Sequence, residues 1–217
     1  FQYDCEPSRP AFAVCRVTRR SATGPGNNPL SAAFRETDML ILPGSLALSA
    51  FRQNRLLRDL QALLPRVTAV HARFVHLVDG QPDAEGHRRL EELLTYGESF
   101  AGADTGELFL VVPRPGTISP WSSKATDIAH NCGVGGVHRI ERATAFYIEG
   151  GPFSADERRQ LSARLHDRMT QAVCGDMAEA AILFRAEEPR PLSTVDILGG
   201  GRAALEWRAH AVVQRVG

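Results

Sequence analysis

The sequence predicts an α+β fold: a two-layer sandwich of mainly antiparallel strands with helices on one face, followed by a linker and the start of a small helical domain. Two observations predict this fold. Short apolar segments rich in β-branched and aromatic residues alternate with segments of helical periodicity. Most helical segments also carry a start or a stop signal. The 217 residues suffice for one well-packed domain with a small attachment.

The first 38 residues show no sustained hydrophobic period and contain the turn-forming stretch Gly24-Pro25-Gly26-Asn27-Asn28-Pro29. Such a segment cannot bury enough apolar surface to offset the entropy lost on ordering. Residues 1–38 are therefore expected to be disordered or a non-native extension. The apolar pattern begins abruptly at Met39, which we expect to be the natural start.

A strand is expected at residues 39–42, where four apolar residues precede Pro43 and Gly44. Ser45 can cap the helix that follows, and Pro65 ends it. The apolar positions of this helix keep roughly helical spacing: Leu48, Phe51, Leu56, Leu60, Leu63 and Leu64.

Residues 67–78 have the composition of a strand, in which apolar residues alternate with polar ones such as His71 and Arg73. His71 and His76 are accordingly interpreted as residues of the strand surface or edge rather than as ligands. Asp83 then caps a helix that Gly97 stops in a left-handed conformation. The expected buried stripe of this helix is Leu90, Leu93 and Leu94.

The order of elements suggests that a second half repeats the first, although the residues show no clear repeat. A buried strand at 107–112 leads into a helix that begins near Ser122 or Ser123, and a second strand spans 137–149 with Phe146 and Ile148 on one face. The capping box of Ser154 and Glu157 opens a last helix. Its apolar residues continue at four-residue steps: Leu161, Leu165, Met169 and Val173.

These patterns divide the chain into an amino-terminal α+β domain at 39–174, a linker at 175–193 and an incomplete helical domain at 194–217. Pro189 and Pro191 mark the linker. A final helix that leaves Leu205 and Trp207 without a partner suggests that the polypeptide continues in the complete protein.

Composition excludes several classes of function. The 25 basic and 25 acidic residues cancel, so no global field attracts nucleic acid or an anionic membrane. No apolar run approaches the ~20 residues that cross a bilayer, and no secretory signal is evident, so the protein is expected to be cytoplasmic.

The four cysteines, Cys5, Cys15, Cys132 and Cys174, are irregularly spaced and are interpreted as reduced thiols. A metal site of His130, Cys132 and His138 has little support, because this spacing matches no common zinc pattern and a fourth ligand is not evident. We therefore predict no metal ligands.

The segment 113–132 contains the single lysine, Lys124, among 25 basic residues. Lysine is a compact charge, whereas arginine is a wide fork, so this position calls for explanation. The segment is not a phosphate-binding loop, because Ser123 rather than glycine precedes the lysine. Ser122, Asp127 and His130 lie too close together in sequence for a nucleophilic triad. Two interpretations stay open: a capped helix with a surface ion pair, or a binding loop.

Residues 113–133 resemble the signature of the amino-terminal region of phosphoribosylformylglycinamidine synthase, the large single-chain type. The resemblance extends in the same order over about residues 39–205. Supporting stretches are 44–52, 94–97, 139–149, 165–169 and 195–202.

This resemblance implies a glutamine-dependent ligase of de novo purine biosynthesis, which uses ATP and magnesium and ammonia released from glutamine. The family's complete chain has an amino-terminal domain, a linker domain, a synthetase core and a glutaminase domain. Only the first part and the opening of the second are matched here. We therefore expect no catalytic, cofactor-binding or metal-binding residues in this chain, and no activity of the chain alone.

The role implied by the resemblance is to dock the synthetase and glutaminase domains of the same full-length chain and to enclose the path of ammonia. On this hypothesis a set of interface candidates faces the catalytic core: Arg114, Trp121, Ser122, Ser123, Lys124, Asp127 and Asn131. Trp121 serves as an apolar anchor and Lys124 meets a carbonyl or carboxylate of that core. The alternative is a free-standing scaffold or regulatory subunit that binds a separate synthetase.

Overall fold

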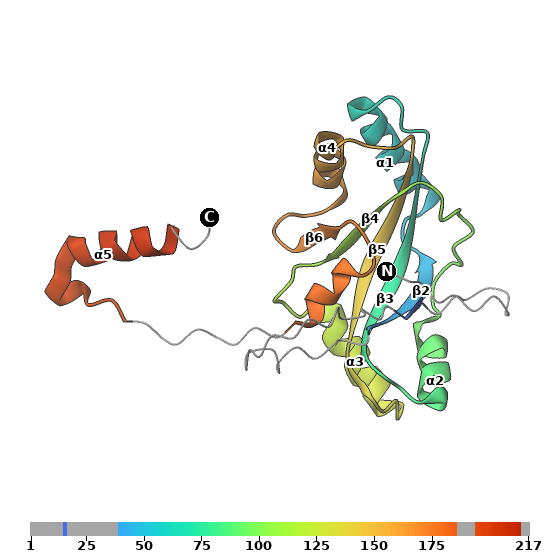
Figure 1. The fold of residues 1–217 in the computed structure, drawn as a ribbon. Helices are drawn as coiled ribbons and strands as arrows, with labels where there is room; N and C mark the ends of the chain where they lie inside the picture. The colour runs from blue at the N-terminus through green and yellow to red at the C-terminus, as the bar shows by residue number, and fades with distance from the viewer. Residues whose placement is uncertain (1–14, 17–38, 186–193, 214–217) are drawn as a thin grey trace, which may run out of the picture. The chain divides into compact units, whose positions relative to one another are not determined.

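The computed structural model describes residues 15–16, 39–185 and 194–213 (Figure 1). The chain divides into two compact units, residues 1–185 and 186–217, which are described separately. The expectation for residues 1–38 falls outside the described residues, apart from a two-residue strand. No helix among the described residues is long and apolar enough to cross a membrane.

The first unit is an antiparallel sheet of six strands in the order β1-β2-β3-β5-β4-β6. The predicted α+β class is confirmed. The elements are β1 (Cys15–Arg16), β2 (Met39–Leu46), α1 (Ala50–Leu63), β3 (Ala69–Gly80), α2 (Ala84–Leu94), β4 (Glu107–Pro113), α3 (Pro120–Asn131), β5 (Val137–Glu149), α4 (Ala155–Leu165), β6 (Gln171–Cys174) and the 3₁₀ helix η2 (Glu179–Phe184).

The elements of the first half recur in the second half at a nearly constant spacing. The series β2, α1, β3, α2 is followed by β4, α3, β5, α4. The two long strands β3 and β5 pair at the centre of the sheet, with Val75 opposite Ala143. The structure therefore shows a repeat of elements, as their order suggested.

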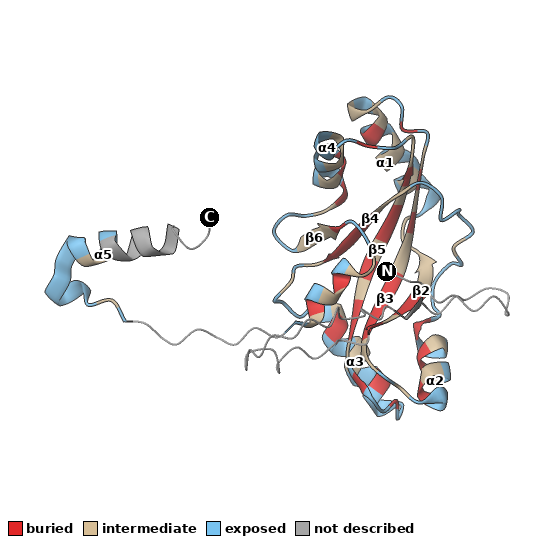
Figure 2. Ribbon diagram, in the orientation of Figure 1, coloured by how far each residue is buried: buried red, intermediate tan, exposed pale blue. Residues whose placement is uncertain are grey.

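The four α-helices cover one face of the sheet, as predicted, and they do so in two pairs. Helices α1 and α4 pack over one end of the central strands, where the buried residues include Leu60 and Leu161. Helices α2 and α3 pack over the other end, around Leu90 and Ala129 (Figures 1 and 2). Each fully buried leucine contributes about 1.5–3 kcal/mol relative to an exposed one.

The opposite face of the sheet carries its own apolar layer, which the sequence did not predict to be covered. Side chains alternate along a strand, so Ile140 and Ile148 of β5 face the helices while Ala143 and Ala145 face the other side. Helix η2 covers this second face through the buried residues Ala180 and Leu183.

The first unit consequently extends to Arg185. Residues 175–185, which sequence reasoning placed in the linker, include η2 and pack on the sheet. Pro189 and Pro191, which marked the expected linker, lie later in the chain and outside the described residues.

The predicted last helix is wrong beyond Leu165. His166 is extended, with φ −135° and ψ 154°, and Asp167 organises a turn by accepting a bond from the backbone of Met169. Val173 then pairs with Val111 as part of β6. The four-residue spacing of apolar residues also suits a short turn followed by an edge strand, so periodicity alone could not separate the two.

Four further expectations differ in detail. His76 is fully buried rather than at a surface or an edge, because β3 is a central strand. Leu93 is exposed. The strand β2 continues past Pro43 through an irregularity in its pairing, so Ser49 rather than Ser45 precedes α1. Ser119 caps α3, ahead of the expected Ser122 or Ser123.

The second unit contains α5 (Ile197–Val213), in line with the expected helical segment. Gly201 interrupts this helix with φ 54° and ψ −143°, a conformation that glycine adopts without steric cost. Leu205 is exposed within this unit, and the side chain of Trp207 falls outside the described residues.

Candidate functional site

A strip that belongs to neither apolar cluster crosses the middle of the helix-covered face, between the two helix pairs. The apolar clusters stop at Ala72 and Phe146 on one side and at Val78 and Ile140 on the other. We call the residues between them the central strip: Phe74 and His76 of β3, and Arg142 and Thr144 of β5.

His76 is the buried centre of this strip. Its Nε2 lies 2.9 Å from the hydroxyl of Tyr96, and its ring stacks on Trp121 with centroids 5.6 Å apart. Its Nδ1 is buried and has no partner among the described residues. Burial lowers the pKa of His76 to about 4, and the positive charge of Arg142 acts in the same direction. His76 is therefore neutral at pH 7.

Arg142 is held by aromatic rings rather than by a carboxylate. Its guanidinium lies 4.4 Å from the ring centroid of Phe74 and 4.9 Å from that of Trp121. Its Nη1 donates to the Tyr96 hydroxyl at 3.3 Å. Cation–π contacts fix the orientation of the charge without neutralising it.

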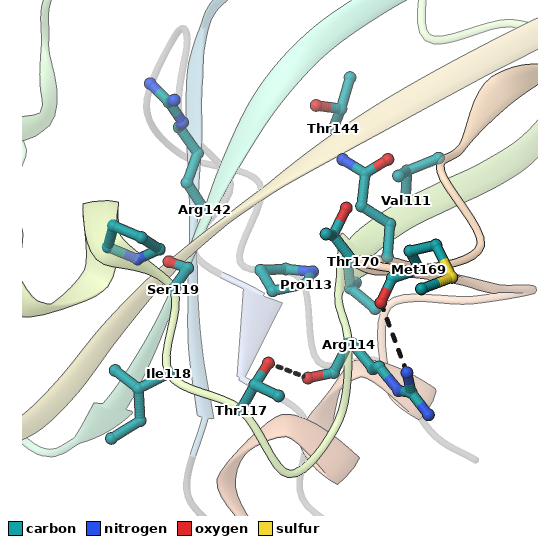
Figure 3. Close-up of a pocket in the computed structure, with 13 residues that line it drawn as sticks. Val111, Pro113, Arg114, Thr117, Ile118, Ser119, Arg142, Thr144, Met169 and Thr170 are labelled. Carbon is teal, nitrogen blue, oxygen red and sulfur yellow. Dashed lines mark hydrogen bonds between the residues drawn. The ribbon is translucent and has the colours of Figure 1, made fainter.

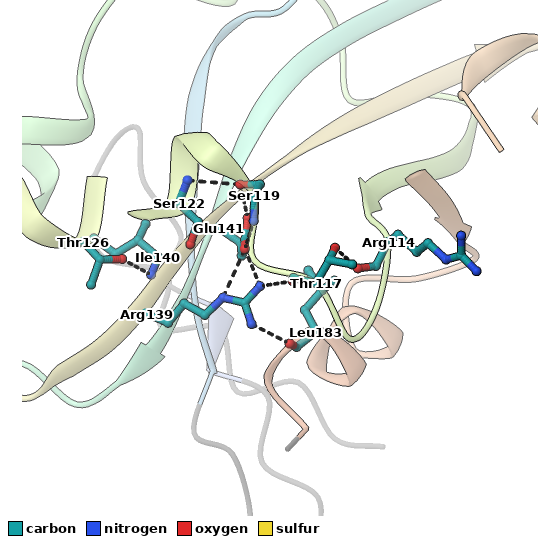
Figure 4. Close-up of polar contacts among 9 residues, drawn as sticks. All are labelled: Arg114, Thr117, Ser119, Ser122, Thr126, Arg139, Ile140, Glu141 and Leu183. Atoms are coloured by element: carbon teal, nitrogen blue, oxygen red, sulfur yellow. Dashed lines mark hydrogen bonds and ion pairs between the residues drawn. The ribbon is translucent and has the colours of Figure 1, made fainter. Parts of the chain in front are cut away.

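The amino terminus of α3 is clamped by a buried carboxylate from β5 (Figure 4). Glu141 is fully buried and accepts hydrogen bonds from the Ser119 hydroxyl at 2.7 Å and from the Ser119 backbone at 3.2 Å. The same Ser119 oxygen accepts from the backbone of Ser122, which caps the helix. Pro120 suits the first turn because it lacks an N–H that would need a partner.

Arg139 completes this clamp and joins it to η2. Its Nε lies 3.0 Å from Glu141, and its other nitrogens donate to the backbone oxygens of Thr117 at 2.6 Å and Leu183 at 3.1 Å. We call Ser119, Arg139 and Glu141 the α3 clamp. The α3 clamp bonds to the β4–α3 loop at Thr117 and Ser119 and to η2 at Leu183. It therefore joins this loop to both β5 and η2.

A hollow of about 510 Å³ opens beside the central strip (Figure 3). One wall is the loop 114–119, and the other is the turn that contains Met169 and Thr170. The backbone of Arg114 donates to Thr170 at 2.9 Å and its guanidinium reaches Met169 O at 3.4 Å, so Arg114 ties the walls together. The lining residues are Val111, Val112, Pro113, Arg114, Thr117, Ile118, Ser119, Pro120, Arg142, Thr144, Met169, Thr170 and Gln171.

Most of the sequence-predicted interface candidates lie on one exposed side of α3: Ser123, Lys124, Asp127 and Asn131. Lys124 has no hydrogen bond or ion pair with any residue that the structure describes. Ile128, which sequence reasoning did not single out, is 52% exposed among them. Arg114 is exposed at the hollow.

Two of the predicted candidates are not on this exposed side. Trp121 is half-buried and packs on His76 and Arg142. Ser122 is fully buried, and its Oγ has no partner among the described atoms. Sequence reasoning placed all seven candidates together because it counted positions along the chain without knowing which side of α3 faces the sheet.

Sequence reasoning also missed Tyr96, Arg142 and Glu141. Glu141 had a detectable signal, since an acidic residue inside the apolar pattern of a long strand is costly to bury unless it is paired. Tyr96 follows α2 and Arg142 lies on β5, so they are far apart in sequence and meet only in the folded domain, which no local pattern could show.

No group of three or more His, Cys, Asp or Glu residues in the described ranges is arranged to hold a metal ion. His130 uses its Nε2 in a 2.8 Å contact with the backbone oxygen of Val137. The backbone oxygen of Cys132 accepts from Arg89 at 3.0 Å. The His130 ring is thus engaged by the backbone, whereas the Cys132 contact uses only its backbone oxygen and its side chain is exposed.

Comparison with known families decides what this domain is. Residues 72–184, from β3 to the end of η2 and just over half of the chain, match the family described as formylglycinamide ribonucleotide amidotransferase N-terminal. The chain belongs to this family. The resemblance seen in residues 113–133 is therefore confirmed, since it named the same enzyme. The chain carries a domain of formylglycinamide ribonucleotide amidotransferase, a multidomain glutamine-dependent ligase of purine biosynthesis.

The formylglycinamide ribonucleotide amidotransferase family uses ATP and magnesium. No step of the ATP-dependent chemistry is assigned to the described residues of this domain.

Proposed function

We propose that this domain docks the synthetase and glutaminase domains of formylglycinamide ribonucleotide amidotransferase and helps to enclose the path of ammonia between them. The observation that carries the proposal is the exposed side of α3. It presents an unpaired lysine, an exposed isoleucine and directional polar groups from Asp127 and Asn131 on one helix.

Rigidity supports docking at this surface. The α3 clamp fixes the first turn of the helix, and Thr126 Oγ1 accepts from the backbone N–H of Ile140 at 3.0 Å. The helix is thereby held along a stretch of β5. A preorganised surface loses little conformational entropy on association, which favours affinity.

The chemistry of ammonia explains why an enclosing domain is useful. Ammonia released into water at neutral pH is mostly protonated, and ammonium has no lone pair with which to attack. A domain that excludes water where two catalytic domains meet keeps ammonia reactive. The mixture of an apolar side chain with a rim of polar ones on α3 is typical of surfaces that become buried in this way.

We also propose that the chain by itself has neither synthetase nor glutaminase activity. A thiol nucleophile requires an accessible thiolate with an adjacent base. Cys174 is buried, and burial followed by the charges of Glu179 and Asp176 raises its pKa to about 11. Cys132 is exposed, and no hydrogen bond joins its thiol to a histidine within the described residues.

The test uses the complete enzyme. Lys124→Ala and Ile128→Ser are expected to lower glutamine-dependent synthesis roughly tenfold, the effect of losing one good interface contact. Synthesis supplied with external ammonia is expected to change less than about twofold, because a docking contact does not take part in the chemical step. Steady-state rates with the two nitrogen sources separate these effects.

A matched control is Arg164→Ala, which removes an exposed charge of α4. It is expected to leave both rates unchanged. The docking assignment would be wrong if Lys124→Ala and Ile128→Ser both left coupled synthesis and domain association as in the wild type. Thermal melting of each variant shows whether a loss comes from unfolding.

A further inference from the structure

We propose that the outward side of α1 is a second docking surface, which binds an acidic surface of the synthetase or glutaminase domain of formylglycinamide ribonucleotide amidotransferase. Four exposed residues form it, and we call them the α1 stripe: Phe51, Arg52, Arg55 and Arg58. The inference rests on the proposed docking function and adds a second contact to it. Helix α1 packs over the opposite end of the central strands from α3, so the two surfaces can meet different parts of the enzyme (Figure 1).

Helical spacing brings the α1 stripe together. Phe51, Arg55 and Arg58 follow one another at intervals of four and three residues, so they lie on one side of the helix. Arg52 precedes Arg55 by three residues and lies beside it. The opposite side of the helix carries Leu60, which is fully buried against the sheet. The α1 stripe therefore faces away from the sheet.

The charges of the α1 stripe are not neutralised within the described part of the domain. None of its three guanidinium groups has a hydrogen bond, an ion pair or a ring contact there. The first turn of the helix carries no acidic residue, and Asp59, four residues after Arg55, forms no ion pair with a described residue. Like charges three residues apart repel each other on a helix, and an acidic partner would relieve that repulsion.

Helix α2 provides a contrast inside the same domain. Its Arg88 lies 2.8 Å from a carboxylate oxygen of Glu85 and 2.7 Å from one of Glu92. Its Arg89 lies 3.0 Å from Glu85. Helix α2 thus neutralises its neighbouring arginines with its own carboxylates, whereas α1 leaves three unpaired. This is the arrangement expected of a surface that receives its carboxylates from a partner.

The aromatic residue indicates that the partner is a protein surface rather than a small anion. The exposed fraction of Phe51 is 71%. An inorganic anion held by the arginines would leave this ring in water, whereas a protein surface can cover the ring and pair with the arginines together. Aromatic residues and arginine are also the types that contribute most to binding at protein interfaces.

The sheet holds the α1 stripe in a fixed position. Gln53 Nε2 donates to the backbone oxygen of Val70 at 2.7 Å, and Gln61 Nε2 donates to that of Val67 at 3.0 Å. These bonds fasten both the first and the last turns of α1 to the start of β3 and the residues before it. A helix fixed in this way loses little conformational entropy when a partner binds.

The scarcity of lysine makes a direct test possible, because Lys124 is the single native lysine of the chain. Arg55→Lys is made in the complete enzyme, which is then treated with a carbodiimide that joins an amine to a carboxylate without a spacer. Peptide mass spectrometry is expected to find the introduced amine joined to an aspartate or glutamate of the synthetase or glutaminase domain. Mixing isotope-labelled with unlabelled enzyme shows whether the product forms within one molecule.

Arg88→Lys is the matched control, because it places the same amine on another exposed helix. It is expected to join Glu85 or Glu92 of its own helix, which shows that the reaction proceeds there. Adding Phe51→Ser to Arg55→Lys is expected to lower the yield of the interdomain product several-fold. Because the ring is exposed in this domain, its loss should leave the melting temperature of the domain unchanged.

The outcomes separate this proposal from docking through α3. If Lys124→Ala and Ile128→Ser disturb coupled synthesis but the Arg55→Lys amine joins neither catalytic domain, docking through α3 stands and the α1 surface is wrong. If the interdomain product forms while the α3 variants have no effect, the α1 surface stands and the α3 assignment fails. Products confined to residues 1–38, or to the same domain of a second enzyme molecule, would overturn the proposed partner.

Discussion

Burial sets the acid–base behaviour of two residues of this domain, His76 and Cys174. His76 and Cys174 are both titratable, both buried, and both shifted toward the neutral form. A low-dielectric surrounding disfavours the charged form of either group, which lowers the pKa of an imidazole and raises that of a thiol. Two measurable consequences follow.

The first consequence concerns stability against pH. Because the pKa of His76 falls from 6.5 in the unfolded chain to about 4 in the folded one, the unfolded chain binds more protons between these values. The stability contributed by neutral His76 is fully present above pH 6.5 and is lost as the pH falls toward 4. The loss amounts to roughly 3 kcal/mol.

Urea unfolding at pH 7, 5.5 and 4 measures this effect. The free energy of unfolding of His76→Gln is expected to fall less steeply with decreasing pH than that of the wild type. His138→Gln, which alters an exposed histidine, is the control and keeps the wild-type slope. Parallel slopes for the wild type and His76→Gln would contradict the assignment.

The second consequence concerns thiol reactivity. Cys132 is exposed, whereas Cys174 is buried with its pKa raised to about 11. Since the thiolate is the reactive form, iodoacetamide at pH 8 is expected to modify Cys132 at least roughly tenfold faster than Cys174. Peptide mass spectrometry over time measures the two rates. In strong denaturant the rates should converge, and equal rates in the folded protein would refute the prediction.

At the scale of an element, α3 shows how a helix is positioned by the strand beside it. Its cap, Ser119, is itself held by Glu141, and Glu141 is paired with Arg139. Removing one member of a buried pair leaves the other uncompensated, which costs about 3–5 kcal/mol. Losing the cap alone costs about 1 kcal/mol, and at most about 2.

These costs predict an order of stabilities for three variants. Glu141→Ala should be the most destabilised in urea unfolding, followed by Ser119→Ala. Glu92→Ala breaks an exposed, solvent-screened pair with Arg88 on α2 and should change the stability least of the three. If Glu141→Ala proved no less stable than Glu92→Ala, the α3 clamp would not stabilise the fold.

At the scale of the molecule, both faces of the sheet in the first unit are buried under other elements, and the stability of the fold depends on both layers. The layer under η2 includes Leu77, Leu110 and Ala145, which would meet water if η2 were absent. Exposure of an apolar sheet face destabilises the fold and promotes association.

Two shortened chains test this arrangement. A chain that ends at Cys174, where sequence reasoning placed the domain boundary, should lose cooperative melting or self-associate. A chain that ends at Arg185 should melt like the first unit of the whole chain. Leu183→Ala in the whole chain gives the matched single-residue effect, a loss of about 2–5 kcal/mol. Similar cooperative melting of both shortened chains would contradict a stabilising role for η2.

Local chemistry explains which parts were predictable from sequence. The span of β5 and the capping box of Ser154 and Glu157 were predicted correctly, because strand alternation and a hydrogen bond over three residues are local. The end of α4 was not, because Met169 and Val173 fit a helical period until β6 pairs with β4. For the candidate site, the same limit explains why Arg114 and Lys124 were named and Tyr96 and Arg142 were not.

The sequence by itself determined the α+β class, the alternation of elements and the family. Local periodicity specifies the first two, and one long motif specifies the third. Only the tertiary structure decided that His76 is buried, that Ser122 points inward, and that Arg114 and Arg142 share a hollow. These features depend on the register of β3 with β5 and on which side of α3 meets the sheet. They arise from contacts between residues far apart in the chain, which no local pattern specifies.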